Sequence, residues 1–261
     1  MRFLESVAFA LMCAPQVLVA QGRSDDFHWE RRLSSGQRVH ASNINGDIVV
    51  TPSSSGRVEI VGIKQGSSRA ADRLTATVQE TDDGIAVCVI RVDSDDECGD
   101  NGYHHHGDDG DWGRASINLE IRLPSSVGID ASSVSGNVDI TGAQGDVRAG
   151  SVSGDVRLMR LRASSVEARS VSGGITASIE SLSGSGPLSF KTVSGDVKLE
   201  LPRGLDADLT MNSVSGQLDS DFQMTLGGGM SRRSIEARIG RGGRELNVAT
   251  VSGDVRLAVI R

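Results

Sequence analysis

One segment of the chain concentrates the side chains that bind metal ions. Residues 93–111, DSDDECGDNGYHHHGDDGD, hold eight carboxylates and three consecutive histidines, and neither lysine nor arginine. Carboxylate oxygens suit Ca²⁺, and imidazole nitrogens suit Zn²⁺ or Ni²⁺. Three adjacent histidines in an extended segment point to alternating sides, so they do not all reach one ion. The candidate ligands are therefore His104, His106, Asp108 and Asp111.

The pattern of this segment fits no established metal motif. It lacks the EF-hand spacing, and the GGxGxD repeat of calcium-binding solenoids does not occur. The formal charge of the whole chain is −7, and this segment accounts for all of it. We expect an acidic, solvated loop over residues 93–113, with divalent-metal binding as the alternative, and we assign no cofactor.

A second set of carboxylates follows a repeated glycine. Asp155, Asp196 and Asp254 each stand in a GD pair and could form an acidic strip, as in carbohydrate-acting β-helix enzymes. Such enzymes usually stack sugars on aromatic rings, yet only Phe190 and Phe222 are aromatic in the repeat region. Turn chemistry alone also favours aspartate after glycine. We therefore expect no catalytic residues, and keep the carbohydrate-acting enzyme as an alternative.

The N-terminus resembles a secretory signal. Arg2 precedes an apolar run over residues 7–14, and small residues lead to Ala20, a plausible cleavage point. Beyond residue 20, no run is long enough to span a membrane. We expect residues 1–20 to be removed on export to the periplasm, cell surface or medium, and residues 21–35 to lead into the fold. The negative charge argues against nucleic-acid binding.

Two cysteines remain after the signal segment, Cys88 and Cys98. An isolated pair in an exported chain predicts a disulfide, which would stabilise the fold chiefly by restricting the unfolded chain. Two free thiols are the alternative.

The element that must position all these residues is a repeat. The octapeptide SVSGDVRL at residues 151–158 has near-copies at residues 192–199 and 250–257. The glycines of its copies are spaced 18 to 22 residues apart, with one larger step of 37: Gly136, Gly154, Gly173, Gly195, Gly216 and Gly253. A period near 19 is typical of a solenoid.

Apolar columns of the alignment predict the interior. Positions seven and five before the glycine, and two and four after it, are mostly aliphatic, with polar residues between them, as in half-buried strands. The position two before the glycine is always valine, and we expect these residues to form a continuous interior column: Val134, Val152, Val171, Val193, Val214 and Val251. The Ser or Thr three before the glycine is expected to bond the backbone of its own turn.

Charges support parallel, in-register stacking in the order of the sequence. Asp130, Arg148 and Glu167 occupy one column and alternate in sign, as residues about 4.8 Å apart should. In the column directly after the glycine, no two aspartates fall on consecutive rungs. Stacked rungs in this order would leave the last strand, RLAVIR, at an open edge where self-association is possible.

The rest of the chain divides around this repeat. Residues 36–125 form a less regular N-terminal β region that begins with a first rung, VHASNINGDIVV, and residues 126–261 form the solenoid. Four strand-like runs between residues 57 and 123 depart from the period and are expected to cover the open end of the stack. Residues 231–243 are interpreted as a degenerate rung.

The early NINGDIVV, the serial VSGDV copies and the signal segment resemble the bacterial "putative adhesin" family of exported domains of unknown function. The resemblance covers roughly residues 36–261 and implies a β-solenoid without catalytic residues. We therefore expect an all-β parallel solenoid that acts as a non-enzymatic adhesin or scaffold. Its partner would be an envelope, glycan or protein ligand.

Overall fold

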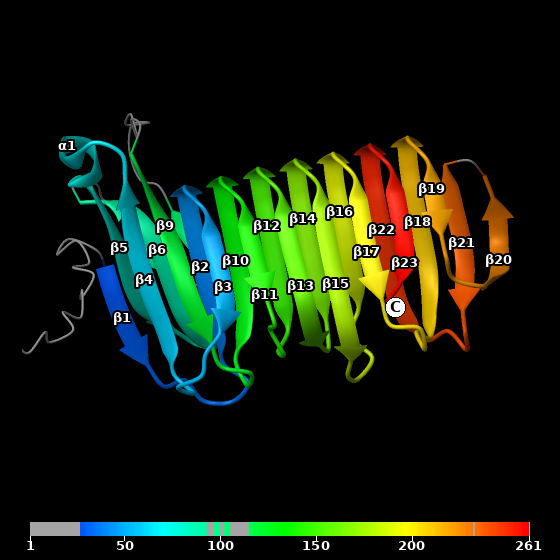
Figure 1. Ribbon diagram of the computed structural model, residues 1–261, viewed down its shortest axis with the longest axis horizontal. Helices are drawn as coiled ribbons and strands as arrows, with labels where there is room; N and C mark the ends of the chain where they lie inside the picture. The colour runs from blue at the N-terminus through cyan, green and yellow to red at the C-terminus, as the bar shows by residue number, and fades with distance from the viewer. Residues whose placement is uncertain (1–26, 93–96, 100–101, 105–114, 232, 261) are drawn as a thin grey trace, which may run out of the picture.

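The repeats stack into an elongated body of two parallel β-sheets (Figure 1). The computed structural model describes residues 27–92, 97–99, 102–104, 115–231 and 233–260. The predicted signal segment, residues 1–20, lies outside these ranges. Within them, no helix is long and apolar enough to cross a membrane.

Sheet A has ten strands. In spatial order they are β1 (Phe27–Arg31), β4 (Val58–Gln65), β9 (Ser116–Leu123), β3 (Ile48–Pro52), β11 (Val138–Thr141), β13 (Val156–Ala163), β15 (Ile175–Leu182), β17 (Val197–Leu201), β23 (Val255–Val259) and β19 (Leu218–Ser220).

Sheet B has eleven strands. They are β20 (Met224–Met230), β21 (Ser234–Ile239), β18 (Ala207–Ser215), β22 (Arg244–Ser252), β16 (Leu188–Ser194), β14 (Val166–Ser172), β12 (Val147–Ser153), β10 (Gly128–Ser135), β2 (Arg38–Asn45), β6 (Gly84–Arg91) and β5 (Leu74–Thr81). A short helix, α1 (Ser68–Ala71), and a hairpin of β7 (Glu97–Gly99) and β8 (Gly102–His104) complete the described elements.

The predicted parallel solenoid is confirmed. Each rung is a sheet B strand, a glycine corner and a sheet A strand, and equivalent residues of neighbouring rungs face one another, as Ile129, Val147 and Val166 do. Four of the expected columns, at −7, −5, +2 and +4 from the glycine, are buried between the sheets except where β19 forms the edge. Burial of each Val, Leu or Ile side chain in these columns contributes about 1.5–3 kcal/mol.

The expected interior column of valines is wrong. Val134, Val152, Val171, Val193, Val214 and Val251 are between 46% and 57% exposed. Strand residues alternate between faces, so positions −7, −5 and −3 point inward together and position −2 points outward. The inward position −3 holds the Ser or Thr, whose side chains are only 2–6% exposed. The residues at −2 therefore form a ladder on the outer face of sheet B.

The buried hydroxyls link neighbouring rungs instead of bonding their own turns. Ser151 Oγ donates to the carbonyl oxygen of Gly136 at 2.8 Å, and Thr192 Oγ1 to that of Gly173 at 2.8 Å. The same bond recurs at Ser133, Ser170, Ser213 and Thr250. These bonds satisfy a polar group that would be costly to bury alone.

The glycines are required by the close approach of successive corners. A Cβ built on Gly154 would lie 2.3 Å from the carbonyl oxygen of Gly136, and one on Gly173 would lie 2.2 Å from that of Gly154. Gly173 also has a φ of 157°. Both contacts are far inside van der Waals distance, so any side chain here would push the rungs apart.

The last rung is inserted out of sequence order. β22 pairs with β16 on one side and β18 on the other, and β23 lies between β17 and β19 (Figure 1, red between yellow and orange). The expected open edge at the C-terminal strand is therefore wrong. The sheet edges near this end are β19 and β20.

The segment interpreted as a degenerate rung makes this insertion possible. β21 runs antiparallel to β18, so residues 231–243 do not form a rung. The turn from β21 to β22 crosses the start of β18, where Asp206 accepts a hydrogen bond from the backbone N–H of Arg241 at 2.8 Å and Asp208 accepts one from that of Gly243 at 3.0 Å. The chain thus returns to place β22 between β16 and β18, which do not pair with each other.

Insertion also changes the charge columns. The predicted alternation holds at the earlier rungs, where Arg148 lies 4.0 Å from Asp130 and 3.6 Å from Glu167. At the inserted rung, however, Asp196 and Asp254 become neighbours, as do Lys198 and Arg256. The like charges are offset, because Lys198 pairs with Asp196 and Arg256 pairs with Asp219 and Asp221.

The four irregular N-terminal runs are the strands β4, β5, β6 and β9. They lengthen both sheets rather than form a sheet of their own. β9 and β6 continue the stack in parallel with β3 and β2, while β4 and β5 add antiparallel strands outside them.

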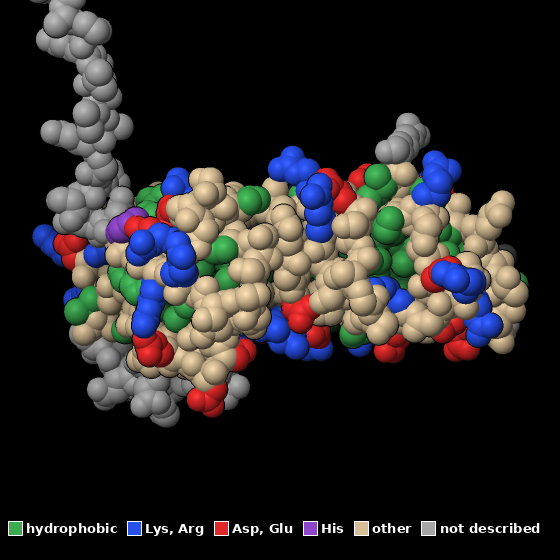
Figure 2. All heavy atoms as spheres, turned by 90° about the horizontal axis from the view of Figure 1, so that it is seen from below, with side chains coloured by type: hydrophobic (Ala, Val, Ile, Leu, Met, Phe, Trp, Pro, Cys, Tyr) green, Lys and Arg blue, Asp and Glu red, His purple; other side chains and the backbone are tan. Residues whose placement is uncertain are grey.

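Arg244 holds the inserted rung in place. Its side chain is 7% exposed and donates to the carbonyl oxygens of Ser164 at 2.7 Å, Ser183 at 2.9 Å and Gly184 at 2.5 Å, and also to that of Gly186. These carbonyls belong to return turns of two earlier rungs, which follow β13 and β15 of sheet A. Figure 2 shows the side of the stack on which these strands end. Burial lowers the pKa of the Arg244 guanidinium, and among the described residues no carboxylate pairs with it.

We predict that Arg244→Met lowers the free energy of unfolding by about 2–4 kcal/mol, because four partly buried hydrogen bonds from a charged donor are lost. Arg162→Met is the matched control, since Arg162 is 60% exposed and pairs only with Glu180 among the described residues. It should cost less than ~1 kcal/mol. Urea denaturation of both variants measures the difference, and equal losses would contradict the role given to Arg244.

Candidate functional site

The strongest candidate site is a shallow groove on the outer face of sheet B. One wall is formed by the first five members of the valine ladder, which we define in stack order as Ile44, Val134, Val152, Val171, Val193, Val251 and Val214. Each member is the position −2 residue of its strand and points away from the core. Aliphatic side chains exposed in an unbroken row mark an interaction surface more strongly than scattered ones do.

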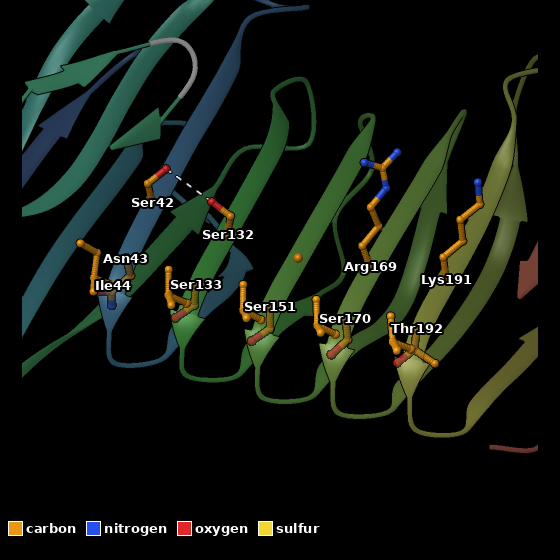
Figure 3. A pocket seen from close by; sticks show the side chains of 15 residues that line it. Ser42, Asn43, Ile44, Ser132, Ser133, Ser151, Arg169, Ser170, Lys191 and Thr192 are labelled. Carbon is orange, nitrogen blue, oxygen red and sulfur yellow. Dashed lines mark hydrogen bonds between the residues drawn. The ribbon is translucent and has the colours of Figure 1, made fainter. Parts of the chain in front are cut away.

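Small residues form the floor of the groove. The outward position two residues before each ladder member holds Ser42, Ser132 and Gly150 on β2, β10 and β12. Next to the taller valines, these small side chains leave a hollow of about 550 Å³ over β2, β10, β12, β14 and β16 (Figure 3). This volume lies within the ~300–1,000 Å³ of small-molecule sites.

Two cations stand at one end of the groove. On β14 and β16 the outward position is Arg169 and Lys191, and both side chains line the groove (Figure 3). Arg169 forms an ion pair with Glu167 of its own strand. Lys191 is exposed and makes no ion pair with any of the described residues. This end of the groove is therefore positive and offers one unneutralised ammonium group.

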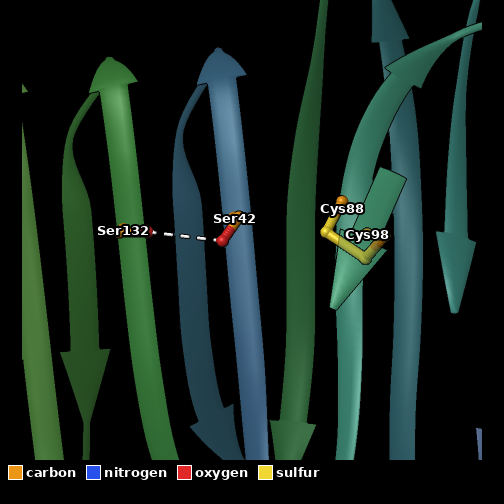
Figure 4. Close-up of a disulfide and its surroundings, with 4 residues drawn as sticks. All are labelled: Ser42, Cys88, Cys98 and Ser132. Carbon is orange, nitrogen blue, oxygen red and sulfur yellow. Dashed lines mark hydrogen bonds between the residues drawn. A yellow bond between two sulfur atoms is a disulfide. The ribbon is translucent and has the colours of Figure 1, made fainter. Parts of the chain in front are cut away.

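The β7–β8 hairpin bounds the other end. A disulfide joins Cys88 of β6 to Cys98 of β7, with a Cα–Cα distance of 5.7 Å (Figure 4). Cys88 is directly opposite Ser42 of β2 in the sheet, and β8 lies beside β2. With Ala86 and Ile90, the two cysteines form a small apolar cluster apart from the main core. The hairpin thus occupies the layer above sheet B where the groove begins.

The polar groups around the groove are mostly engaged. Ser42 Oγ lies 3.4 Å from Ser132 Oγ. The hydroxyls of Ser133, Ser151, Ser170 and Thr192 already donate to glycine carbonyls. Backbone groups of the strands are paired in the sheet. The groove therefore offers a ligand apolar contact along its length and a cation at one end.

A charged column runs beside the groove, two positions further from the glycine corner. It contains Asp130, Arg148 and Glu167, in which Arg148 is close to both carboxylates. Burial raises the pKa of Asp130, which His40 and the two nearby arginines oppose. Arg148 offsets the charge of one of the two carboxylates, and Glu167 also pairs with Arg169.

The acidic strip of GD pairs is a structural ladder. Asn137 Oδ1 accepts the backbone N–H of Asp155 at 2.9 Å, and Asp155 Oδ1 accepts that of Gly174 at 2.9 Å. Asp196 and Asp254 accept the next N–H groups in the same way, at 3.0 and 2.8 Å. The carboxylates are committed to backbone donors, and none of these three aspartates lines the groove.

The candidate metal ligands are not brought together by anything the structure describes. His106, Asp108 and Asp111 lie outside the described residues, and His104 closes β8 with its side chain likewise outside them. Within the described ranges no group of three or more His, Cys, Asp or Glu side chains could hold a metal ion.

The groove was missed at the level of sequence because its main residues were assigned to the core. The signal was nevertheless present, since an invariant valine at position −2 breaks the inward parity of positions −7, −5 and −3. Counting residues from the corner would have placed the valines outside. The small residues and cations of the neighbouring column could then have been recognised as a floor and an end.

Comparisons with known proteins identify relatives of the fold. A family model described as Toastrack DUF4097 matches residues 32–258. A "putative cell adhesion protein" from Clostridium sporogenes ATCC 15579 has a solved structure that aligns with a TM-score of 0.51 at 8% identity, over 90% of this chain and 100% of that chain. No curated protein matches.

A second solved structure, a "putative adhesin" from Bacteroides fragilis NCTC 9343, aligns at 13% identity over 91% of this chain and 98% of that chain. Its TM-score of 0.42 is too low to support an argument. The clostridial likeness concerns the fold alone.

We predict that two valines of one strand respond differently to the same substitution. Val171→Thr should change the free energy of unfolding by less than ~0.5 kcal/mol, because Val171 is 48% exposed. Val166→Thr, also on β14 but 1% exposed, should lower it by about 1–3 kcal/mol through a buried hydroxyl. Chemical denaturation measures both. A large loss of unfolding free energy for Val171→Thr would mean that the ladder stabilises the fold instead of serving as a free surface.

We predict that Asp196 acts as a hydrogen-bond acceptor whose charge stabilises the fold at neutral pH and loses this effect in acid. The N–H of Asp254 holds the pKa of Asp196 below its ordinary 3.8. The charge therefore contributes stability above pH 3.8, and this contribution is lost as the pH falls through the lower folded-state pKa.

Asp196→Asn should remove this acid-dependent contribution while keeping a hydrogen-bond acceptor. Asn137 already plays that part in the same column, where its Oδ1 accepts the backbone N–H of Asp155. Asp196→Ala should lose the acceptor at every pH, at a cost of about 0.5–1 kcal/mol. Thermal melts of the three proteins between pH 2.5 and 7 distinguish these outcomes. A melting temperature for Asp196→Asn that falls in parallel with that of the wild type would refute the assignment.

Proposed function

Because the chain belongs to the Toastrack DUF4097 family, we propose that it is an exported, non-enzymatic protein of the bacterial envelope or surface that holds a partner on the outer face of sheet B. The single observation that carries this proposal is the valine ladder, whose valines are each 46–57% exposed. Leaving so many aliphatic groups in water has no benefit for folding, since a polar β-former such as Thr would serve there equally well.

The N-terminal segment and the disulfide both support export. The first 20 residues have the composition of a signal segment. We further propose that the bond between Cys88 and Cys98 forms on export, because disulfides persist in oxidising compartments. The clostridial neighbour bears the name of a cell adhesion protein, which agrees with an adhesive role.

A non-enzymatic role is supported by what the described polar side chains do. The aspartates of the GD pairs accept backbone hydrogen bonds, and the hydroxyls at position −3 donate to backbone carbonyls. Both sets hold the corners together. The groove itself is walled by aliphatic side chains, which can bind a partner but not transform it.

Cosedimentation with washed envelope fragments of the producing bacterium tests the proposal. We expect the chain from residue 21 onward to bind, and Val152→Thr/Val171→Thr to lower the bound fraction at least about fivefold, because adjacent apolar contacts are lost. Val49→Thr/Val61→Thr is the matched control, with the same chemistry on outward residues of sheet A. Loss of binding in the control alone would overturn the assignment of the face.

The same cells test export. Fractionation followed by mass spectrometry should find the chain outside the cytoplasm with Gln21 as its first residue. A cytoplasmic chain that retains residues 1–20 would refute export.

A further inference from the structure

We propose that the groove binds one long-chain fatty carboxylate, with the acyl chain lying across the rungs against the valine ladder and the carboxylate beside Lys191. This inference rests on the proposed function and names the chemistry of the partner. It follows from the length of the groove, its polarity and the position of its cations.

The dimensions suit a single acyl chain. The groove crosses five strands, from β2 to β16. At a strand spacing of ~4.8 Å this corresponds to about 19 Å. With carbon–carbon bonds of ~1.5 Å in a zigzag, a chain of about 14 to 16 carbons covers that length. The volume of about 550 Å³ accommodates such a chain and its headgroup.

The polarity of the groove favours a hydrocarbon over a peptide or a glycan. A peptide lying across the strands would find no free backbone groups, because the strands below it are paired with one another. Its own N–H and C=O groups would remain unsatisfied, which is costly against an apolar wall. Among the described residues, no aromatic side chain lines the groove to stack on a sugar. An aliphatic chain has no such requirement.

The cations place and define the headgroup. Arg169 and Lys191 stand on adjacent strands at one end of the groove, and only Arg169 has an acidic partner among the described residues. A carboxylate there would pair with the Lys191 ammonium and could also approach the Arg169 guanidinium. At the other end, Ser42 and Ser132 bond each other and the β7–β8 hairpin follows, so the methyl end of the chain belongs there.

The hairpin disfavours a second copy of the protein as the occupant. Sheet B is eleven strands wide, and the groove starts on β2, directly beside β6. A second sheet centred on the groove would extend over β6, where the disulfide-linked hairpin already fills the layer. A single chain of atoms fits between the hairpin and the cations without this clash.

Displacement of cis-parinarate fluorescence from the full chain tests the inference. We expect tetradecanoate to displace the probe below its micellar concentration and hexanoate to bind at least about 100-fold more weakly, since each methylene removed costs two- to fourfold in affinity. Val152→Thr/Val171→Thr should weaken tetradecanoate binding about tenfold. Val251→Thr/Val214→Thr, on the same ladder beyond the groove, should leave it unchanged.

A second set of measurements tests recognition of the carboxylate head group. Lys191→Gln should weaken tetradecanoate at least about fivefold but leave tetradecan-1-ol unchanged, because the alcohol carries no charge. Lys198→Gln, on the outer face of sheet A, is the matched control. Equal effects of Lys191→Gln on acid and alcohol would overturn the assigned orientation.

The remaining outcomes separate this inference from the proposed function. No displacement by tetradecanoate, with envelope binding still dependent on Val152 and Val171, overturns the fatty carboxylate and leaves the proposed function standing. Binding to anionic phospholipid vesicles without binding to free tetradecanoate overturns it in favour of membrane lipid. A dimer in light scattering that Val152→Thr/Val171→Thr abolishes overturns it in favour of self-association.

Discussion

The glycine corner is the contact on which the rest of the structure depends. At each corner a backbone carbonyl lies so near the next glycine that a Cβ would clash, as at Gly154 above Gly136. Two hydrogen bonds cross the same gap, one from a buried hydroxyl such as Ser151 and one to a side-chain oxygen such as Asn137 Oδ1. Together they fix both the spacing and the register of the rungs, because a shift by one residue would break both bonds.

This register makes every column of the repeat continuous, inside and outside. The interior columns bury aliphatic side chains, which provides the main stabilisation. The same geometry lines up Val134, Val152 and Val171 on the outer face, at the spacing of the strands. A single exposed valine in each rung thus becomes part of a long apolar wall when the rungs stack. The proposed binding surface is in this sense a direct consequence of the corner.

The ends of the stack depend on contacts that the repeat does not encode. β16 and β18 are not paired with each other, because β22 lies between them. The chain reaches this position after β21, which runs antiparallel to β18. Arg244 then links the inserted strand to return turns of two earlier rungs. At the other end, the Cys88–Cys98 disulfide ties the β7–β8 hairpin over β6 and closes the groove. Irregular segments therefore delimit a surface that the regular ones generate.

The sequence alone determined the all-β solenoid, its period and its register, because a two-residue alternation and a repeated glycine are local signals that recur in every rung. The repeated valine of the ladder was also visible in the sequence. Strand alternation counted from the glycine places it, Val171 included, on the outer face, opposite to positions −7, −5 and −3. The order of the last rungs was decided only by tertiary structure, since sequence order carries no information about where β22 finds a partner. The groove likewise exists only in the folded stack, where Gly150, Arg169 and Lys191, separate in sequence, become neighbours on adjacent strands.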